Sequence, residues 1–193
     1  GRAEEIGAVR LGWVMRLPGT EREVALAEIE ADIGGATERY LMPLCIAFED
    51  QQPPAVAEQL ALTRVRQGRR VGFLTDAAVL DGLAAGVVRA LREGAQVPLP
   101  DGGAIVFAPT ARLEEVRVER GAPADLAQAD EPAGSLVVTD QVAVKLFRHM
   151  AFGPMCEERT ARRLTDLGFP YAPPLIGAVA RADAAGRRAP VAL

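Results

Sequence analysis

The chain is poor in the side chains that most enzymes use for nucleophilic or metal chemistry. Its 193 residues include one histidine (His149), one serine (Ser135), two cysteines and no asparagine. A Ser-His-Asp hydrolase would need that serine and histidine to meet, and Ser135 is not flanked by the glycines of a nucleophile elbow. A zinc site needs more histidine or cysteine ligands than the sequence supplies. We therefore assign no catalytic residue and no metal ligand.

Charge and hydropathy exclude further classes of protein. The net charge is −4 and the sequence contains no long basic patch, so we expect no nucleic-acid partner. No apolar run reaches membrane-spanning length, and no signal-peptide pattern opens the chain, so we expect no membrane partner. Cys45 and Cys156 lie far apart without CxxC spacing, which indicates reduced thiols and a cytoplasmic location.

The apolar pattern predicts an α+β fold that begins with a β-rich antiparallel cap containing one long helix. The expected strands of the cap cover residues 6–17, 22–32, 39–48, 60–66, 70–74 and 104–107. Pro43 argues that its strand is an edge or carries a bulge. A helix is expected over 75–93, with every fourth residue from Val79 to Leu91 apolar, Thr75 or Asp76 as its cap, and Gly94 at its end.

The composition changes at residues 121–134, which are rich in Ala, Asp and Pro and predict a linker. We therefore divide the chain into a cap (1–120), a linker (121–134) and a second β-rich part (135–193). In the second part we expect strands over 135–139, 142–148, 175–181 and 189–193, and a helix over 155–167 that ends at Gly168. The last strand stops at the apolar Leu193, which suggests a piece of a longer polypeptide.

A single lysine, Lys145, stands among 21 arginines. Lysine is a compact point charge, whereas the guanidinium of arginine is a wide planar fork. A strand lysine followed by a helix and two strands is the order of a protein-kinase-like N-lobe, in which the lysine holds ATP phosphates and pairs with a helix glutamate. Glu157 and Glu158 are the ion-pair candidates, and Glu157 shares a helix face with Ala161 and Leu164. The alternative is that both glutamates only favour a helix N-terminus.

The region around this lysine resembles maltokinases. The similarity runs without gaps from about Ser135 to Ala178. It is carried by Lys145-Leu146-Phe147-Arg148, Gly153, Arg162, Leu164-Thr165, Gly168-Phe169-Pro170 and Pro173-Pro174-Leu175-Ile176-Gly177-Ala178. Upstream, the strand Glu38–Leu44 and the helix that follows are similar to the N-terminal cap of that family.

The resemblance implies a bilobal kinase-like fold, with residues 135–193 as part of its N-lobe. It implies transfer of a phosphoryl group from ATP to maltose, with Mg²⁺. Lys145, Gly134 and Ser135 would contact the ATP phosphates, and Ala143 would line the nucleotide pocket. The family's catalytic Asp and metal ligands lie in a C-terminal lobe. No HxD-type loop is present here, so we expect the fragment alone to be inactive and to bind no cofactor.

The implied partners are the C-terminal kinase lobe and a fused or associated trehalose synthase. Two positions depart from the family pattern: Pro132 removes an N–H from the expected phosphate loop, and Arg159 stands where the family has an acidic residue. Three alternatives stay open. They are a divergent kinase for another sugar such as an amino sugar, a non-catalytic interaction or regulatory module, and an α+β domain in which Lys145 is a solvated strand residue.

Overall fold

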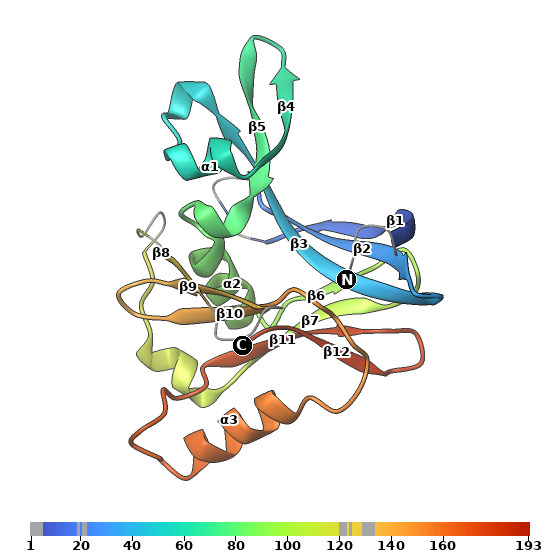
Figure 1. Ribbon diagram of the computed structural model, residues 1–193. Coiled ribbons are helices and arrows are strands. Elements are labelled where there is room, and N and C mark those ends of the chain that lie inside the picture. Colours follow the sequence, from blue (N-terminus) through green and yellow to red (C-terminus); the bar gives the residue numbers. More distant parts are fainter. Residues whose placement is uncertain (1–5, 19, 21–22, 120–122, 124, 129–133) are drawn as a thin grey trace.

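The part of the chain that the structure describes folds into two antiparallel sheets with three α-helices, and one of the sheets is curved into a half-barrel (Figure 1). The computed structural model describes residues 6–18, 20, 23–119, 123, 125–128 and 134–193. The five-stranded sheet has the order β1 (Ile6–Arg16), β2 (Ala25–Ile33), β3 (Ala36–Phe48), β5 (Arg70–Asp76), β4 (Ala61–Gln67). The predicted α+β class is therefore confirmed.

The seven-stranded sheet has the order β6 (Gln96–Pro98), β7 (Ala104–Pro109), β11 (Gly177–Ala182), β12 (Arg188–Ala192), β10 (Ala143–Phe147), β9 (Gly134–Val138), β8 (Asp125–Gln128). The helices are α1 (Ala55–Gln59), α2 (Leu83–Arg92) and α3 (Cys156–Asp166), with short 3-10 turns η2 (Glu49–Gln51), η3 (Ala77–Val79) and η4 (Ala111–Glu115). Among the residues described, no helix is long and apolar enough to cross a membrane.

The hairpins of the first sheet form where the sequence places turn residues. Gly34 and Gly35 turn β2 into β3 with φ of 58° and 84°, values that glycine adopts without steric cost. Gly68, with φ of 61°, turns β4 into β5. Pro43 lies in an interior strand rather than at an edge. Its segment pairs with β2 on one side, and the pairing with β5 on the other side begins only at Leu44.

The predicted helix over 75–93 is wrong at its start, because α2 begins only at Leu83. Gly82 precedes it with φ of 107°, a left-handed conformation that interrupts the helix. Thr75 belongs to β5, and the Asp76 carboxylate accepts a hydrogen bond from the Ala78 N–H (2.8 Å), so it caps η3 instead. Gly94, with φ of 56°, ends α2 as expected. Because the predicted helix face is buried, α2 packs inside the core that both sheets share.

The seven-stranded sheet contains residues from both sides of the predicted linker. β6 and β7 precede residue 121, whereas β9 to β12 follow residue 133. Within the linker range, residues 125–128 form β8, which pairs with β9. Residues 121–122, 124 and 129–133, including Pro132, lie outside the part of the chain that the structure describes.

A buried ion pair joins the two sheets. Glu28 on β2 and Arg181 on β11 are 1% and 4% exposed, and Arg181 Nε lies 2.8 Å from Glu28 Oε2. Arg181 also donates to Asp101 in the turn before β7. Burial raises the pKa of Glu28, and the positive charge of Arg181 opposes this rise. The pair therefore links the sheets through charges that neither sheet exposes to water.

Gly72 lets β5 lie close to the last residues of β3. A Cβ at this position would lie 2.5 Å from the Ala47 carbonyl oxygen and 2.9 Å from the Phe48 Cα, both rigid backbone atoms. We expect Gly72→Ala to destabilise the fold by about 1–3 kcal/mol, as overpacking does. Gly153→Ala is the control, since a Cβ there meets nothing within 4 Å. Urea denaturation of both variants checks this, and equal midpoints would contradict it.

Asp32 makes a pH-dependent contribution to the stability of the first sheet. Its carboxylate accepts two hydrogen bonds from Arg10 (2.9 Å each) and one from Thr37 (2.8 Å), which lower its pKa. A lowered pKa stabilises the fold above the unfolded-state pKa, and this contribution is lost as pH falls through the folded-state value. The melting temperature of Asp32→Asn should therefore lie below that of the wild type at neutral pH and converge with it in acid. A constant difference would contradict this.

Candidate functional site

Lys145 lies at the centre of an interior strand. In β10 it faces Leu136 of β9 on one side. On the other side its N–H donates to the Leu193 carbonyl (2.9 Å), and its carbonyl accepts from the Leu193 N–H (3.0 Å). Hydrogen bonds on both sides therefore hold the backbone of Lys145, which fixes the point from which its side chain extends.

The segment after β10 is attached to the first sheet. The Leu41 N–H donates to the Arg148 carbonyl, and the Met150 N–H donates to the Arg39 carbonyl, each at 2.8 Å. The Arg148 guanidinium lies 2.8 Å from the Asp76 carboxylate. These contacts give the chain a defined path from the lysine strand toward α3.

Phe152 fixes the end of that path. Its ring lies among three guanidinium groups, those of Arg39 (5.9 Å), Arg181 (4.9 Å) and Arg187 (5.3 Å), at cation–π distances. The next residue, Gly153, donates its N–H to the Arg188 carbonyl (3.0 Å). The N-terminus of α3 is thus positioned against β12, the strand next to the Lys145 strand β10.

The structure pairs Lys145 with Glu157. The Lys145 ammonium lies 2.6 Å from Glu157 Oε1, and the two side chains are 24% and 44% exposed. Glu158, the other candidate, accepts from Arg162 instead (2.9 Å). Glu157 is the glutamate that the sequence pattern placed on the same helix face as Ala161 and Leu164. The pairing contradicts the alternative of a lysine in open solvent far from any acid.

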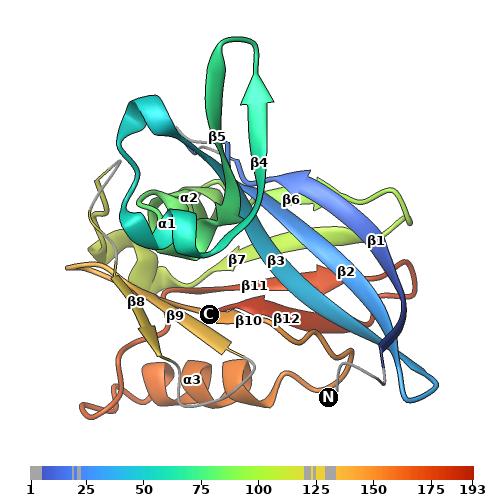
Figure 2. The ribbon, with the colours of Figure 1, turned by 45° about the horizontal axis from the view of Figure 1, so that its top comes forward.

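The opposite side of α3 carries Arg159, which departs from the family pattern, and Arg163. Neither Arg159 nor Arg163 forms an ion pair with any residue that the structure describes. The helix contains no buried residue, and it lies outside the two sheets (Figures 1 and 2). At its C-terminal end, Thr165 Oγ1 accepts from the Leu175 N–H (2.7 Å), which attaches the helix to the segment before β11.

The phosphate-binding candidates are divided between two faces of the sheet. Residues directly opposite in an antiparallel pair share a face, so Gly134 opposite Phe147 lies on the Lys145 face. Ala143, two residues before Lys145, also lies on that face and is exposed. Ser135 is opposite the buried Leu146 and therefore lies on the other face.

Ser135 is engaged away from the lysine. Its Oγ accepts a hydrogen bond from Arg148 Nε at 2.9 Å. The expectation that Ser135 joins Lys145 at phosphate is therefore not met in this arrangement, because strand register places the two side chains on opposite faces.

Comparison with known proteins adds no identification. No family model and no curated protein matches this chain. The similarity to maltokinases therefore remains a hypothesis based on the residues quoted above.

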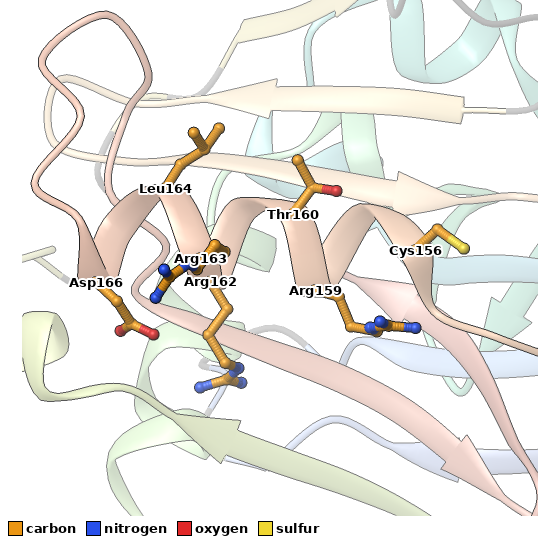
Figure 3. Close-up of a pocket in the computed structure, with 7 residues that line it drawn as sticks. All are labelled: Cys156, Arg159, Thr160, Arg162, Arg163, Leu164 and Asp166. Carbon is orange, nitrogen blue, oxygen red and sulfur yellow. The ribbon is translucent and has the colours of Figure 1, made fainter.

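Two hollows flank α3. The smaller, about 230 Å³, adjoins the ion pair and is lined by Phe147, Pro154, Met155, Cys156, Glu157, Glu158, Pro190 and Leu193. The larger, about 630 Å³, is lined among the described residues by α3 alone, through Cys156, Arg159, Thr160, Arg162, Arg163, Leu164 and Asp166 (Figure 3). In Figure 3 the arginine side chains extend from one side of the helix, and Thr160 and Leu164 from the other.

The smaller hollow is below the range of about 300–1,000 Å³ that is usual for small-molecule sites.

Sequence reasoning missed Phe152 and Met155, because the cation–π contacts and the hollow exist only once distant strands meet. No group of three or more His, Cys, Asp or Glu able to hold a metal was found among the described residues. The site thus offers a half-buried ammonium on β10 that is oriented by a carboxylate on α3.

Proposed function

We propose that this chain is the N-terminal part of an ATP-dependent sugar kinase that resembles maltokinase. The observation that carries the proposal is the 2.6 Å contact between Lys145 on β10 and Glu157 on α3. A strand lysine held by a helix glutamate is the arrangement that orients ATP phosphates in protein-kinase-like enzymes. Residues 1–120 would then form the cap, 121–134 the linker, and 135–193 the start of the N-lobe.

In this proposal each residue has a limited task. The Lys145 ammonium binds oxygens of the α- and β-phosphates, and Glu157 keeps the amine turned toward them. Ala143 and Gly134, on the same face, leave room for the nucleotide, because neither carries a large side chain. Mg²⁺, when bound with ATP, would screen phosphate charge, and its ligands and the catalytic Asp would come from the C-terminal lobe. We place the protein in the cytoplasm.

Turnover by the full-length polypeptide tests this function. We expect that polypeptide, incubated with ATP, Mg²⁺ and maltose, to yield a sugar 1-phosphate signal in ³¹P NMR. Lys145→Met should lower the rate by about 10²–10³-fold, as loss of one preorganised electrostatic group does. Glucosamine in place of maltose tests the divergent-kinase alternative. The absence of phosphorylation of either sugar, or unchanged turnover in Lys145→Met, would contradict the proposal.

A second candidate is a non-catalytic interaction module, for example one attached to a trehalose synthase. The observation that favours it is α3 itself, which buries no residue and presents Arg159 and Arg163 without an ion pair among the described residues. Exposed arginines on a surface helix suit an acidic protein surface. Under this candidate the full-length protein would not bind ATP–Mg²⁺, whereas Arg159→Glu would weaken its partner complex.

A further inference from the structure

Arg148 connects β9, the strand beside the lysine strand, with the five-stranded sheet. It follows β10 directly, and its Nε donates to Ser135 Oγ on β9 at 2.9 Å. Its Nη2 lies 2.8 Å from Asp76 Oδ2 at the end of β5. Both side chains of this ion pair are largely shielded from water. One guanidinium therefore bridges a hydroxyl of one sheet and a carboxylate of the other.

The five-stranded sheet holds Arg148 at two points. The Arg148 carbonyl accepts from the Leu41 N–H of β3 at 2.8 Å, which fixes the backbone of the residue. The other oxygen of Asp76 accepts from the Ala78 N–H, so η3 orients the carboxylate that the guanidinium contacts. Arg148 is therefore anchored in the five-stranded sheet, and Ser135 is the residue of the other sheet that it holds.

Ser135 lies directly behind the face proposed to bind phosphate. It is opposite the buried Leu146 and so faces the core, whereas its neighbour Gly134 lies on the Lys145 face. A bond that holds Ser135 from behind also limits where Gly134 can lie relative to the lysine, because the two residues are adjacent in one strand. The hydroxyl thus anchors β9 instead of contacting phosphate.

The two contacts of Arg148 require an arginine. A guanidinium presents its Nε and Nη donors in one rigid plane, so it can reach the hydroxyl and the carboxylate together. Lysine keeps the positive charge but places a single nitrogen where arginine places two. Arg148→Lys can therefore keep the ion pair with Asp76 or hold Ser135, and it should loosen β9 much as Ser135→Ala does.

We propose that Arg148 is a positioning residue, which ties β9 to Asp76 and thereby holds the phosphate-binding end of that strand beside the Lys145 ammonium. This inference rests on the kinase function proposed above. It assigns the five-stranded sheet a role in supporting the nucleotide site of the other sheet. Loss of the tie should weaken ATP–Mg²⁺ binding and raise the KM for ATP, while the KM for the sugar stays near the wild-type value.

Isothermal titration of the full-length polypeptide with ATP–Mg²⁺ measures this effect. Ser135→Ala and Arg148→Lys should each bind about fivefold more weakly than the wild type, as loss of one hydrogen bond does. Thr139→Ala is the matched control, because Thr139 Oγ1 accepts from the Val142 N–H (3.1 Å) at the other end of the same hairpin. It loosens the hairpin without changing the contacts of Arg148, and it should bind as the wild type does.

Asp76→Asn tests the link to the five-stranded sheet. Asparagine keeps a side-chain oxygen for the Ala78 N–H but removes the charge that Arg148 contacts. It should also weaken ATP–Mg²⁺ binding. The double variant Asp76→Asn/Ser135→Ala should lose less affinity than the product of the two single losses, because both changes act through Arg148. Fully multiplicative losses would overturn the proposed tie.

Hydrogen exchange without nucleotide tests the anchoring separately from the kinase function. Residues 134–138 should exchange faster in Ser135→Ala and Arg148→Lys than in the wild type, and unchanged exchange would overturn the anchoring. Wild-type ATP–Mg²⁺ binding that these two variants leave unchanged, or that Thr139→Ala weakens equally, would overturn this proposal alone. No binding to the wild type would overturn the kinase function, and this proposal with it.

Discussion

Glu157→Ala should lower sugar phosphorylation by the full-length protein about 100-fold, whereas Glu158→Ala should change it little. The two glutamates are adjacent on α3, but only Glu157 lies against the Lys145 ammonium, at 2.6 Å, and Glu158 is occupied by Arg162. Without Glu157 the lysine keeps its charge but loses the group that turns it toward phosphate. Steady-state kinetics of both variants check the prediction.

Glu157 is a positioning residue in this account, so its loss has a distinct signature. Both kcat and the KM for ATP should worsen, while the KM for the sugar stays near the wild-type value. Glu157→Asp, which keeps the carboxylate on a shorter side chain, should recover part of the rate. Equal losses of activity in Glu157→Ala and Glu158→Ala would contradict the assigned role. So would a loss of activity in Glu157→Ala that is accompanied by a lower melting temperature in that variant alone.

Arg181→Met should destabilise the fold by about 3–5 kcal/mol, the usual cost of leaving a buried charge without its partner. Glu28 is 1% exposed and would then lie buried, with its charge opposed by Arg39 at the longer distance of 3.8 Å. Arg187→Met is the control, because Arg187 also contacts Phe152 but pairs with Asp183 at the surface. Urea denaturation should show a change of at most about 1 kcal/mol for the control.

The penalty in Arg181→Met should depend on pH. Burial raises the pKa of Glu28, and the loss of Arg181 removes the charge that opposes this rise. A carboxyl with a raised folded-state pKa favours folding at low pH, and this contribution is lost as pH rises through that value. The variant should therefore be least impaired in acid. The double variant Glu28→Leu/Arg181→Met should recover much of the lost stability, and a double variant as unstable as Arg181→Met would contradict the account.

Local signals predicted strands of both sheets and the choice of glutamate. Gly34-Gly35 and Gly68 have the positive φ values that their turns require, and a helical face of period 3.6 distinguished Glu157 from Glu158. The helix before residue 93 was overextended, because the apolar repeat continues through Gly82 and the sequence does not reveal its left-handed conformation.

Features that depend on tertiary pairing were not predicted. β8 lies in a stretch rich in Ala, Asp and Pro, and it is a strand because β9 pairs with it. Ser135 is adjacent to Gly134 in sequence, but register places it opposite Leu146 and away from Lys145. The buried Glu28–Arg181 pair joins residues from opposite ends of the chain, and the sequence contains no local sign of it.

Binding of ATP–Mg²⁺ by the full-length protein tests the central claim most directly. Isothermal titration should show saturable binding to the wild type and an affinity at least about tenfold weaker for Lys145→Met, a loss of about 1.4 kcal/mol or more. Leu62 lies on β4, in the other sheet, so Leu62→Lys should bind ATP–Mg²⁺ as the wild type does. No binding to the wild type, or equal affinities for the wild type and Lys145→Met, would contradict a phosphate-binding role for Lys145.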